Sequence, residues 1–133
     1  MYKGKHLLID CRNVPHQTCL NDKRMLEIMA SAAGKAGATV ISQVRYRFEE
    51  GSPPGFAAIV MLDESHCSAH SYADLGLLAI DIFTCGSTDP RQLLRYICDE
   101  VDIGDFTVRE IERFDTTGDL NQERSIPKSI AWS

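Results

Sequence analysis

The sequence lacks three features that would point to particular classes of protein. It has no run of basic residues and no CxxC pair, and it has no apolar stretch long enough to cross a bilayer. Its 14 Lys and Arg are outnumbered by 19 Asp and Glu, so the formal net charge is −5 at pH 7. We therefore expect no nucleic-acid surface and no membrane attachment. No N-terminal signal peptide is recognisable in the sequence.

The number and spacing of the cysteines indicate the cellular compartment. Five are present, an odd number, and their scattered spacing is typical neither of a disulfide framework nor of a zinc ribbon. Free thiols of this kind favour a reducing environment, so we expect a cytoplasmic protein. The 133 residues are 44% hydrophobic, enough for one domain, residues 1–133, with its own core.

Strand patterns outnumber helix patterns. Six segments are expected to be strands: Lys5–Cys11, Ala38–Phe48, Phe56–Leu62, His66–Tyr72, Leu77–Thr84 and Phe106–Ile111. Asn21 can cap a first helix that Gly37 ends, and Asp89-Pro90 can open a second. The prolines and glycines of Glu49–Gly55 predict a loop, and no regular element is expected after Asp115.

The order of these elements indicates the fold class. Adjacent strands with short connections favour antiparallel pairing, and two helices can cover only one face of the resulting sheet. We predict a two-layer α+β sandwich, with a mainly antiparallel sheet and two helices on one face. The other face is then expected to bind a ligand or a second copy of the chain, which makes a homodimer the expected assembly.

The acid-hydroxyl-imidazole triplet Glu64-Ser65-His66 follows a smooth apolar run, Phe56–Leu62. A metal site is disfavoured, because no carboxylate or cysteine pair completes a ligand set with His66 and His70. A serine hydrolase is disfavoured because no GxSxG motif surrounds Ser65. A plain polar turn and a self-cleaving serine both remain open. In the second case the hydroxyl attacks the preceding carbonyl, and elimination from the resulting ester ends in a pyruvoyl group.

A longer segment around this triplet carries a family resemblance. The sequence DESHCSAHSYADLGLLAIDIFTCG, Asp63 to Gly86, resembles the signature of the short prokaryotic S-adenosylmethionine decarboxylase proenzymes. That family has an acid-Ser-His motif, a second histidine, and a strand that ends in Phe-Thr-Cys-Gly. Weaker similarity extends over most of the chain, including GKHLLID near the start and Arg47-Phe48.

The resemblance implies how the chain is processed. Ser65 becomes the covalent pyruvoyl cofactor, which forms a Schiff base with the substrate. The chain is cut between Glu64 and Ser65 into residues 1–64 and 65–133. His70 corresponds to the histidine that removes the α-proton of the ester intermediate.

The resemblance also implies which residues form the substrate site. Cys85 corresponds to the cysteine that protonates the substrate carbon after CO2 leaves. Phe48 corresponds to an aromatic residue that stacks on the adenine and sulfonium, and Asp74 to an acid that binds the ribose hydroxyls. The implied activity is a pyruvoyl-dependent carboxy-lyase that makes decarboxylated S-adenosylmethionine for spermidine synthesis.

Some positions depart from the family pattern. Ala57 stands where the family has a hydroxyl residue that assists processing, although Ser52 offers a hydroxyl in the preceding loop. Asp74 is one methylene shorter than the usual glutamate. Two other hypotheses therefore stay open. One is a pyruvoyl-dependent arginine or ornithine decarboxylase, and the other is an uncleaved homologue that regulates an active partner.

Overall fold

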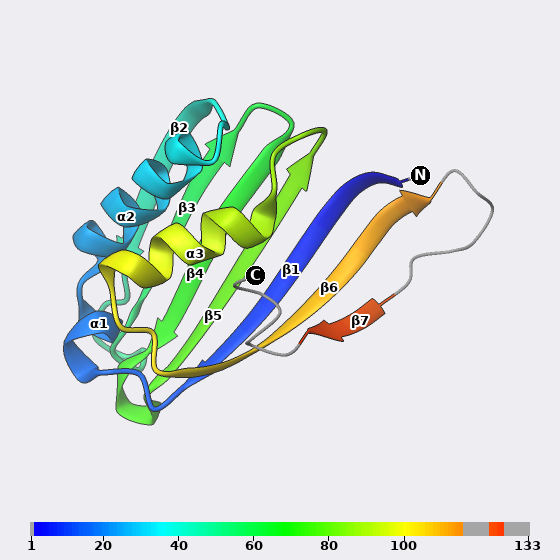
Figure 1. The fold of residues 1–133 in the computed structure, drawn as a ribbon. Coiled ribbons are helices and arrows are strands. Elements are labelled where there is room, and N and C mark those ends of the chain that lie inside the picture. The colour runs from blue at the N-terminus through cyan, green and yellow to red at the C-terminus, as the bar shows by residue number, and fades with distance from the viewer. Residues whose placement is uncertain (1, 116–122, 127–133) are drawn as a thin grey trace.

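Seven antiparallel strands form one sheet in the computed structural model, which describes residues 2–115 and 123–126. Their order across the sheet is β2-β3-β4-β5-β1-β6-β7 (Figure 1). The strands are β1 (Tyr2–Arg12), β2 (Val40–Arg47), β3 (Phe56–Leu62), β4 (Ser65–Tyr72), β5 (Leu77–Cys85), β6 (Asp105–Asp115) and β7 (Glu123–Ile126). Strands β3, β4 and β5 follow one another through short turns, which places the Ser65 end of β4 well inside the sheet.

The helices lie on one face of this sheet (Figure 1). They are α1 (His16–Leu20), α2 (Asp22–Lys35) and α3 (Pro90–Glu100), with a single 3-10 turn, η1 (Ala73–Leu75), between β4 and β5. Asn21 Oδ1 accepts the Arg24 N–H at 3.1 Å and caps α2. Asp89 Oδ1 accepts the Arg91 N–H at 2.9 Å and caps α3. Both caps satisfy backbone donors that have no partner within the helix.

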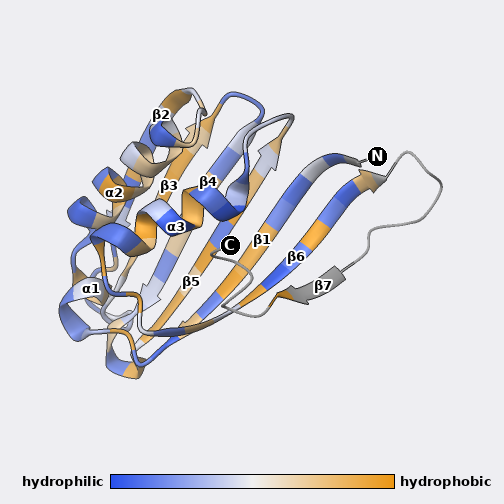
Figure 2. Ribbon diagram, viewed as in Figure 1, coloured by the Kyte–Doolittle hydropathy of each residue, from blue (hydrophilic) through white to orange (hydrophobic). Residues whose placement is uncertain are grey.

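The core lies between the helices and the covered face of the sheet. Every second residue of β3, β4 and β5 is buried there, and the intervening residues face the opposite side. In Figure 2, β3 is coloured tan to orange along its length, because the residues that it exposes are apolar as well. Helix α2 contributes a buried stripe at helical spacing: Met25, Ile28, Met29, Ala32 and Ala33. The sheet face without helices is called the open face below.

The expected fold class is confirmed. Every strand pair is antiparallel, and α2 and α3 are the two helices whose caps the sequence predicts. Three elements were missed: α1, which is only five residues long, the 3-10 turn η1, and β7. Strand β6 also runs to Asp115, beyond its expected end at Ile111, because it pairs with β1 over nearly its whole length.

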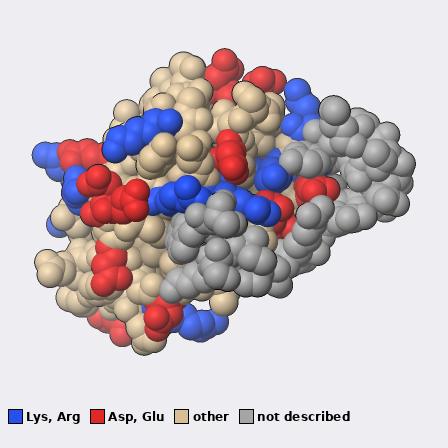
Figure 3. All heavy atoms as spheres, in the orientation of Figure 1, with Lys and Arg blue, Asp and Glu red and all other residues tan. Residues whose placement is uncertain are grey.

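Charges of both signs are interspersed over the helix-covered side of the molecule (Figure 3). No described helix is long and apolar enough to span a membrane. Within the described ranges, no three His, Cys, Asp or Glu side chains are grouped so that they could hold a metal ion.

Candidate active site

The Glu64–Ser65 peptide bond lies in the tight turn between β3 and β4. The register pairs Leu62 with Ser65, so Asp63 and Glu64 make up the whole turn. Glu64 has a φ of 60°, in the left-handed region that costs a side-chain-bearing residue roughly 1–2 kcal/mol. The residue whose carbonyl belongs to the expected cleavage site is therefore held in a strained backbone conformation.

Ser65 is linked directly to Cys85. The backbone N–H of Cys85 donates a hydrogen bond to Ser65 Oγ at 3.2 Å, and both residues are half-buried. Cys85 ends β5, and Gly86 follows it with a φ of 67°, which lets the chain turn away at once. Two of the expected catalytic residues thus share one end of the sheet, and the serine keeps its own O–H proton for transfer to a base.

Cys67 is the other thiol close to Ser65 in sequence, but it belongs to the core. Its side chain is fully buried, and burial, with a smaller contribution from the charge of Asp81, raises the pKa of Cys67 to about 12. It points to the helix-covered side, where the core excludes a ligand. The geometry therefore favours Cys85 over Cys67 as a group that meets substrate.

A cluster of rings and one carboxylate lies on the open face next to this end. His6 Nε2 and Asp81 Oδ1 are 3.1 Å apart, and this hydrogen bond holds the pKa of Asp81 below its ordinary value. The ring of Phe83 lies 5.8 Å from that of His6 and 5.7 Å from that of His66. Burial, together with the nearby His6, lowers the pKa of His66. A neutral imidazole is therefore favoured beside Ser65 near neutral pH.

This cluster was not predicted from the sequence. His6 and Asp81 are 75 positions apart, and no local motif joins them. They meet because both β1 and β4 pair with β5, which lines up His66, Phe83 and His6 in one row. Asp81, a single carboxylate within the apolar strand β5, was the available signal, and it does not specify the partner.

His70 is not near Ser65 within one chain. Both lie on β4, five residues apart, which in an extended strand separates them by about 16 Å. The odd spacing also directs the two side chains to opposite faces of the sheet. His70 pairs with Ala57 on one side and Ala79 on the other, towards the far end of the sheet.

Phe48 and Asp74 lie at the same end as His70. Phe48 follows β2, and its N–H donates to the Gly55 carbonyl at 3.0 Å. Its ring centroid is 6.2 Å from that of Tyr46, which shares a row with His70 through Ala57. Asp74 is exposed in η1, directly after β4.

The expected site residues therefore form two separate groups. The cleavage group is Glu64, Ser65 and Cys85, and the binding group is Phe48, His70 and Asp74. The structure brings together the members of the cleavage group at one end of β4, while the binding group surrounds the other end. Within one chain, the cleavage group and the binding group therefore do not form one site.

A family model described as S-adenosylmethionine decarboxylase matches residues 5–114. The chain belongs to this family. The members are decarboxylases, so the expectation of a carboxy-lyase is confirmed. The match spans β1 through most of β6 and so includes both groups of site residues.

Individual relatives agree with this assignment. A protein of Symbiobacterium thermophilum named S-adenosylmethionine decarboxylase proenzyme is 42% identical over 96 residues, which cover 71% of this chain and 70% of the relative. One of the same name from Moorella thermoacetica is 33% identical over 111 residues, covering 83% and 86%. The crystal structure of the adenosylmethionine decarboxylase from Aquifex aeolicus matches with a TM-score of 0.76 at 26% identity, covering 91% of this chain and 98% of that one.

Proposed function

We propose that the chain is a proenzyme that cuts itself between Glu64 and Ser65. The fragments, residues 1–64 and 65–133, stay together as a pyruvoyl enzyme that decarboxylates S-adenosylmethionine and thereby supplies spermidine synthesis. The observation that carries the proposal is the Ser65 hydroxyl placed directly after the left-handed Glu64. The names of the relatives support both the substrate and the term proenzyme.

The residues at the turn suit the cleavage chemistry. Ser65 Oγ forms a bond to the carbonyl carbon of Glu64, the C–N bond breaks, and the nitrogen takes the hydroxyl proton, which leaves an ester. A base then removes the α-proton of Ser65, the Cβ–Oγ bond breaks, and Glu64 leaves as a carboxylate. The remaining dehydroalanine takes up water and loses ammonia to give the pyruvoyl group. The strain at Glu64 is released in the first of these steps.

Ser65 suits the proposed pyruvoyl group, because it begins β4 and is hydrogen-bonded to the last residue of β5. Once formed, the group supplies a carbonyl that acts as an electron sink for an amino-acid substrate. Cys85 then donates the proton to the substrate carbon that has lost CO2. A thiol carries a transferable proton and so can serve as this donor.

The separation of the cleavage and binding groups supports a homodimer. Strands β2 and β3 expose apolar side chains on the open face: Val44, Tyr46, Ile59 and Met61. A second copy would cover such a surface. If the two open faces meet about a two-fold axis that lies between the sheets and across the strands, each cleavage group comes to lie over the binding group of the other copy. His70 of one chain then lies over the backbone of Ser65 in the other, and the α-proton that it removes is carried by that backbone.

The same arrangement places Phe48 and Asp74 across from Cys85. In that position Phe48 stacks on the adenine and sulfonium, and Asp74 accepts hydrogen bonds from the ribose hydroxyls. All five cysteines are free thiols, which supports a reducing compartment, and we propose the cytoplasm.

Two measurements on one preparation test the function. Intact mass after incubation at neutral pH is expected to show two fragments divided before Ser65, and the Ser65→Ala variant is expected to stay one chain. Release of CO2 is then compared for S-adenosylmethionine, arginine and ornithine. Preference for either basic amino acid would overturn the substrate, and a chain that stays whole and releases no CO2 would overturn the proenzyme proposal.

A further inference from the structure

Strand β2 directs two arginines to one face and aromatic rings to the other. Arg45 pairs with the buried Ala58, so it points to the helix side, and Arg47 lies on that same side two residues later. Tyr46, between them, points to the open face, and its ring lies 6.2 Å from that of Phe48. Tyr46 is 54% exposed in the single chain although it is large and aromatic, so its ring can contact a ligand held where the proposed second copy meets the open face.

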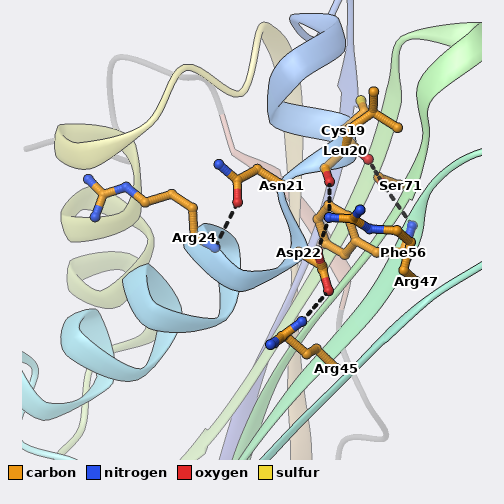
Figure 4. A network of polar contacts seen from close by, with 9 residues as sticks. All are labelled: Cys19, Leu20, Asn21, Asp22, Arg24, Arg45, Arg47, Phe56 and Ser71. Atoms are coloured by element: carbon orange, nitrogen blue, oxygen red, sulfur yellow. Dashed lines mark hydrogen bonds and ion pairs between the residues drawn. The ribbon is translucent and has the colours of Figure 1, made fainter.

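Both arginines bind one buried carboxylate, that of Asp22 at the start of α2 (Figure 4). Arg45 Nη1 donates to Oδ2 at 2.7 Å and Arg47 Nη2 to Oδ1 at 2.9 Å. Arg47 Nη2 also donates to the Leu20 carbonyl at 3.3 Å. Burial alone would raise the pKa of Asp22, but the hydrogen bonds and charges of Arg45 and Arg47 outweigh it and keep the pKa below its ordinary value. The carboxylate is therefore ionised at neutral pH.

The turn that carries Asp22 is itself anchored to the sheet. Ser71 Oγ donates to the Cys19 carbonyl at 2.6 Å and accepts the Phe56 N–H at 3.0 Å (Figure 4). Ser71 and Phe56 are both fully buried. Asp22 is thus held in place, and its ion pairs with Arg45 and Arg47 attach the end of β2 to the start of α2.

These ion pairs matter for the position of β2, because β2 is an edge strand. Among the described strands its one neighbour is β3, and its last residue, Arg47, leads into the loop before Phe56. An edge strand that ends in a loop is easily displaced. The clamp formed by Asp22, Arg45 and Arg47 therefore sets where the rings of Tyr46 and Phe48 lie.

We propose that Tyr46 is a second ring of the substrate site beside Phe48, and that Asp22 is a positioning residue that holds both rings through Arg45 and Arg47. The inference rests on the proposed function. The ligand that these rings suit is planar and cationic, and the adenine and sulfonium of S-adenosylmethionine fit that description. Adenine stacks on aromatic faces, and a positive charge is attracted to the same faces.

Binding can be measured apart from turnover in the Ser65→Ala chain, which forms no pyruvoyl group. Calorimetry with S-adenosylmethionine is expected to show about a tenfold weaker Kd for Tyr46→Ala and an unchanged Kd for Tyr46→Phe. Asp22→Asn is expected to weaken binding several-fold. In the cleavable chain the same variants should raise KM by similar factors and leave kcat within about twofold, since the rings bind the substrate equally in the ground and transition states.

If Asp22 only stabilised the fold, the losses of binding in the single and double variants would follow a different pattern. If Asp22 acts through the rings, Asp22→Asn costs much less binding in the Tyr46→Ala background than alone. Glu100→Gln is the matched control, because it breaks the exposed 3.4 Å pair between Arg24 of α2 and Glu100 of α3 and should leave binding unchanged.

The outcomes separate the inference from the function on which it rests. Equal affinity and KM for Tyr46→Ala and Tyr46→Phe would overturn the role of Tyr46, and fully additive losses would overturn the role of Asp22. If Ser65→Ala does not bind S-adenosylmethionine and the cleavable chain does not turn it over, the proposed function fails together with the inference.

Discussion

The backbone N–H of Cys85 donates a 3.2 Å hydrogen bond to the hydroxyl of Ser65. This bond joins the last residue of β5 to the first residue of β4. The proposed proton donor for the substrate and the proposed source of the cofactor are therefore neighbours before any processing occurs. The proposed elimination removes Oγ from Ser65, so this hydrogen bond belongs to the uncleaved chain.

The roles of the two thiols near Ser65 can be separated by substitution. Cys85→Ala is expected to cleave normally and to lose most turnover, because the substrate carbon no longer receives its proton. Misplaced protonation should also inactivate the enzyme faster through transamination. Cys67→Ala should keep its turnover, since Cys67 lies in the core. Intact mass and CO2 release check both variants, and similar behaviour of the two would exclude Cys85 as the donor.

The strain at Glu64 predicts a change in stability. Replacing Glu64 by Gly in the Ser65→Ala chain should raise the free energy of unfolding by roughly 0.5–1 kcal/mol, because glycine adopts a φ of 60° freely, although its unfolded chain is more flexible. Urea unfolding measures the change. Lys3→Gln is the control for the exposed 3.6 Å pair between Lys3 and Glu64, and it should have little effect. A destabilised Glu64→Gly chain would show that the turn is unstrained.

His66 predicts a pH dependence of stability. Its pKa in the folded chain is below the ordinary 6.5, so between these two values the unfolded chain binds more protons than the folded one. Stability is therefore expected to rise with pH in that interval and to be lost as the pH falls below 6.5. Unfolding of Ser65→Ala at pH 7.5, 6 and 5 should show this slope, and His66→Gln should reduce it. An unchanged slope in His66→Gln would assign it to other groups.

The ion pairs of Asp22 and of Glu100 are expected to contribute very different amounts to the free energy of unfolding. Asp22→Asn is expected to lower the free energy of unfolding by roughly 1–2 kcal/mol, because it weakens two hydrogen bonds to a buried carboxylate whose arginine partners are partly in solvent. Glu100→Gln breaks an exposed pair and should cost less than about 0.5 kcal/mol. Denaturant unfolding of the two variants compares them, and equal costs would show that the clamp contributes no more than a surface pair.

The proposed homodimer predicts complementation between two inactive chains. Ser65→Ala cannot form the cofactor, and His70→Ala lacks the base. In a mixed dimer, Ser65 of the His70→Ala chain meets His70 of the other copy, so one of the two sites is complete. Random mixing should restore cleavage of the His70→Ala chain alone, with about a quarter of the wild-type activity.

Mass spectrometry of the mixture identifies which chain is cut. Sedimentation should in addition show a dimer for each single variant. Cleavage of His70→Ala by itself, or no cleavage after mixing, would rule out a site shared between copies.

Much of the local structure could be predicted from the sequence. The caps at Asn21 and Asp89 and the limits of Phe56–Leu62 depend on residues a few positions apart, and the structure agrees with each. The family could be recognised for a similar reason, because its motif lies in one continuous segment. The short helix α1 was missed since it has no side-chain cap and only one buried residue, Cys19.

The tertiary structure decided how the site residues are distributed. The sequence places His70 five residues after Ser65, which suggests proximity, but an extended strand converts that spacing into about 16 Å and opposite faces. The pairing of His6 with Asp81 and the clamp at Asp22 depend on strand register and on the packing of α2 against β2. Local propensity fixes where strands and helices begin and end, whereas contacts between distant residues are set by how the whole chain buries its apolar surface. For that reason the sequence alone determined the chemistry available to this protein, and the packed sheet determined which groups can act together.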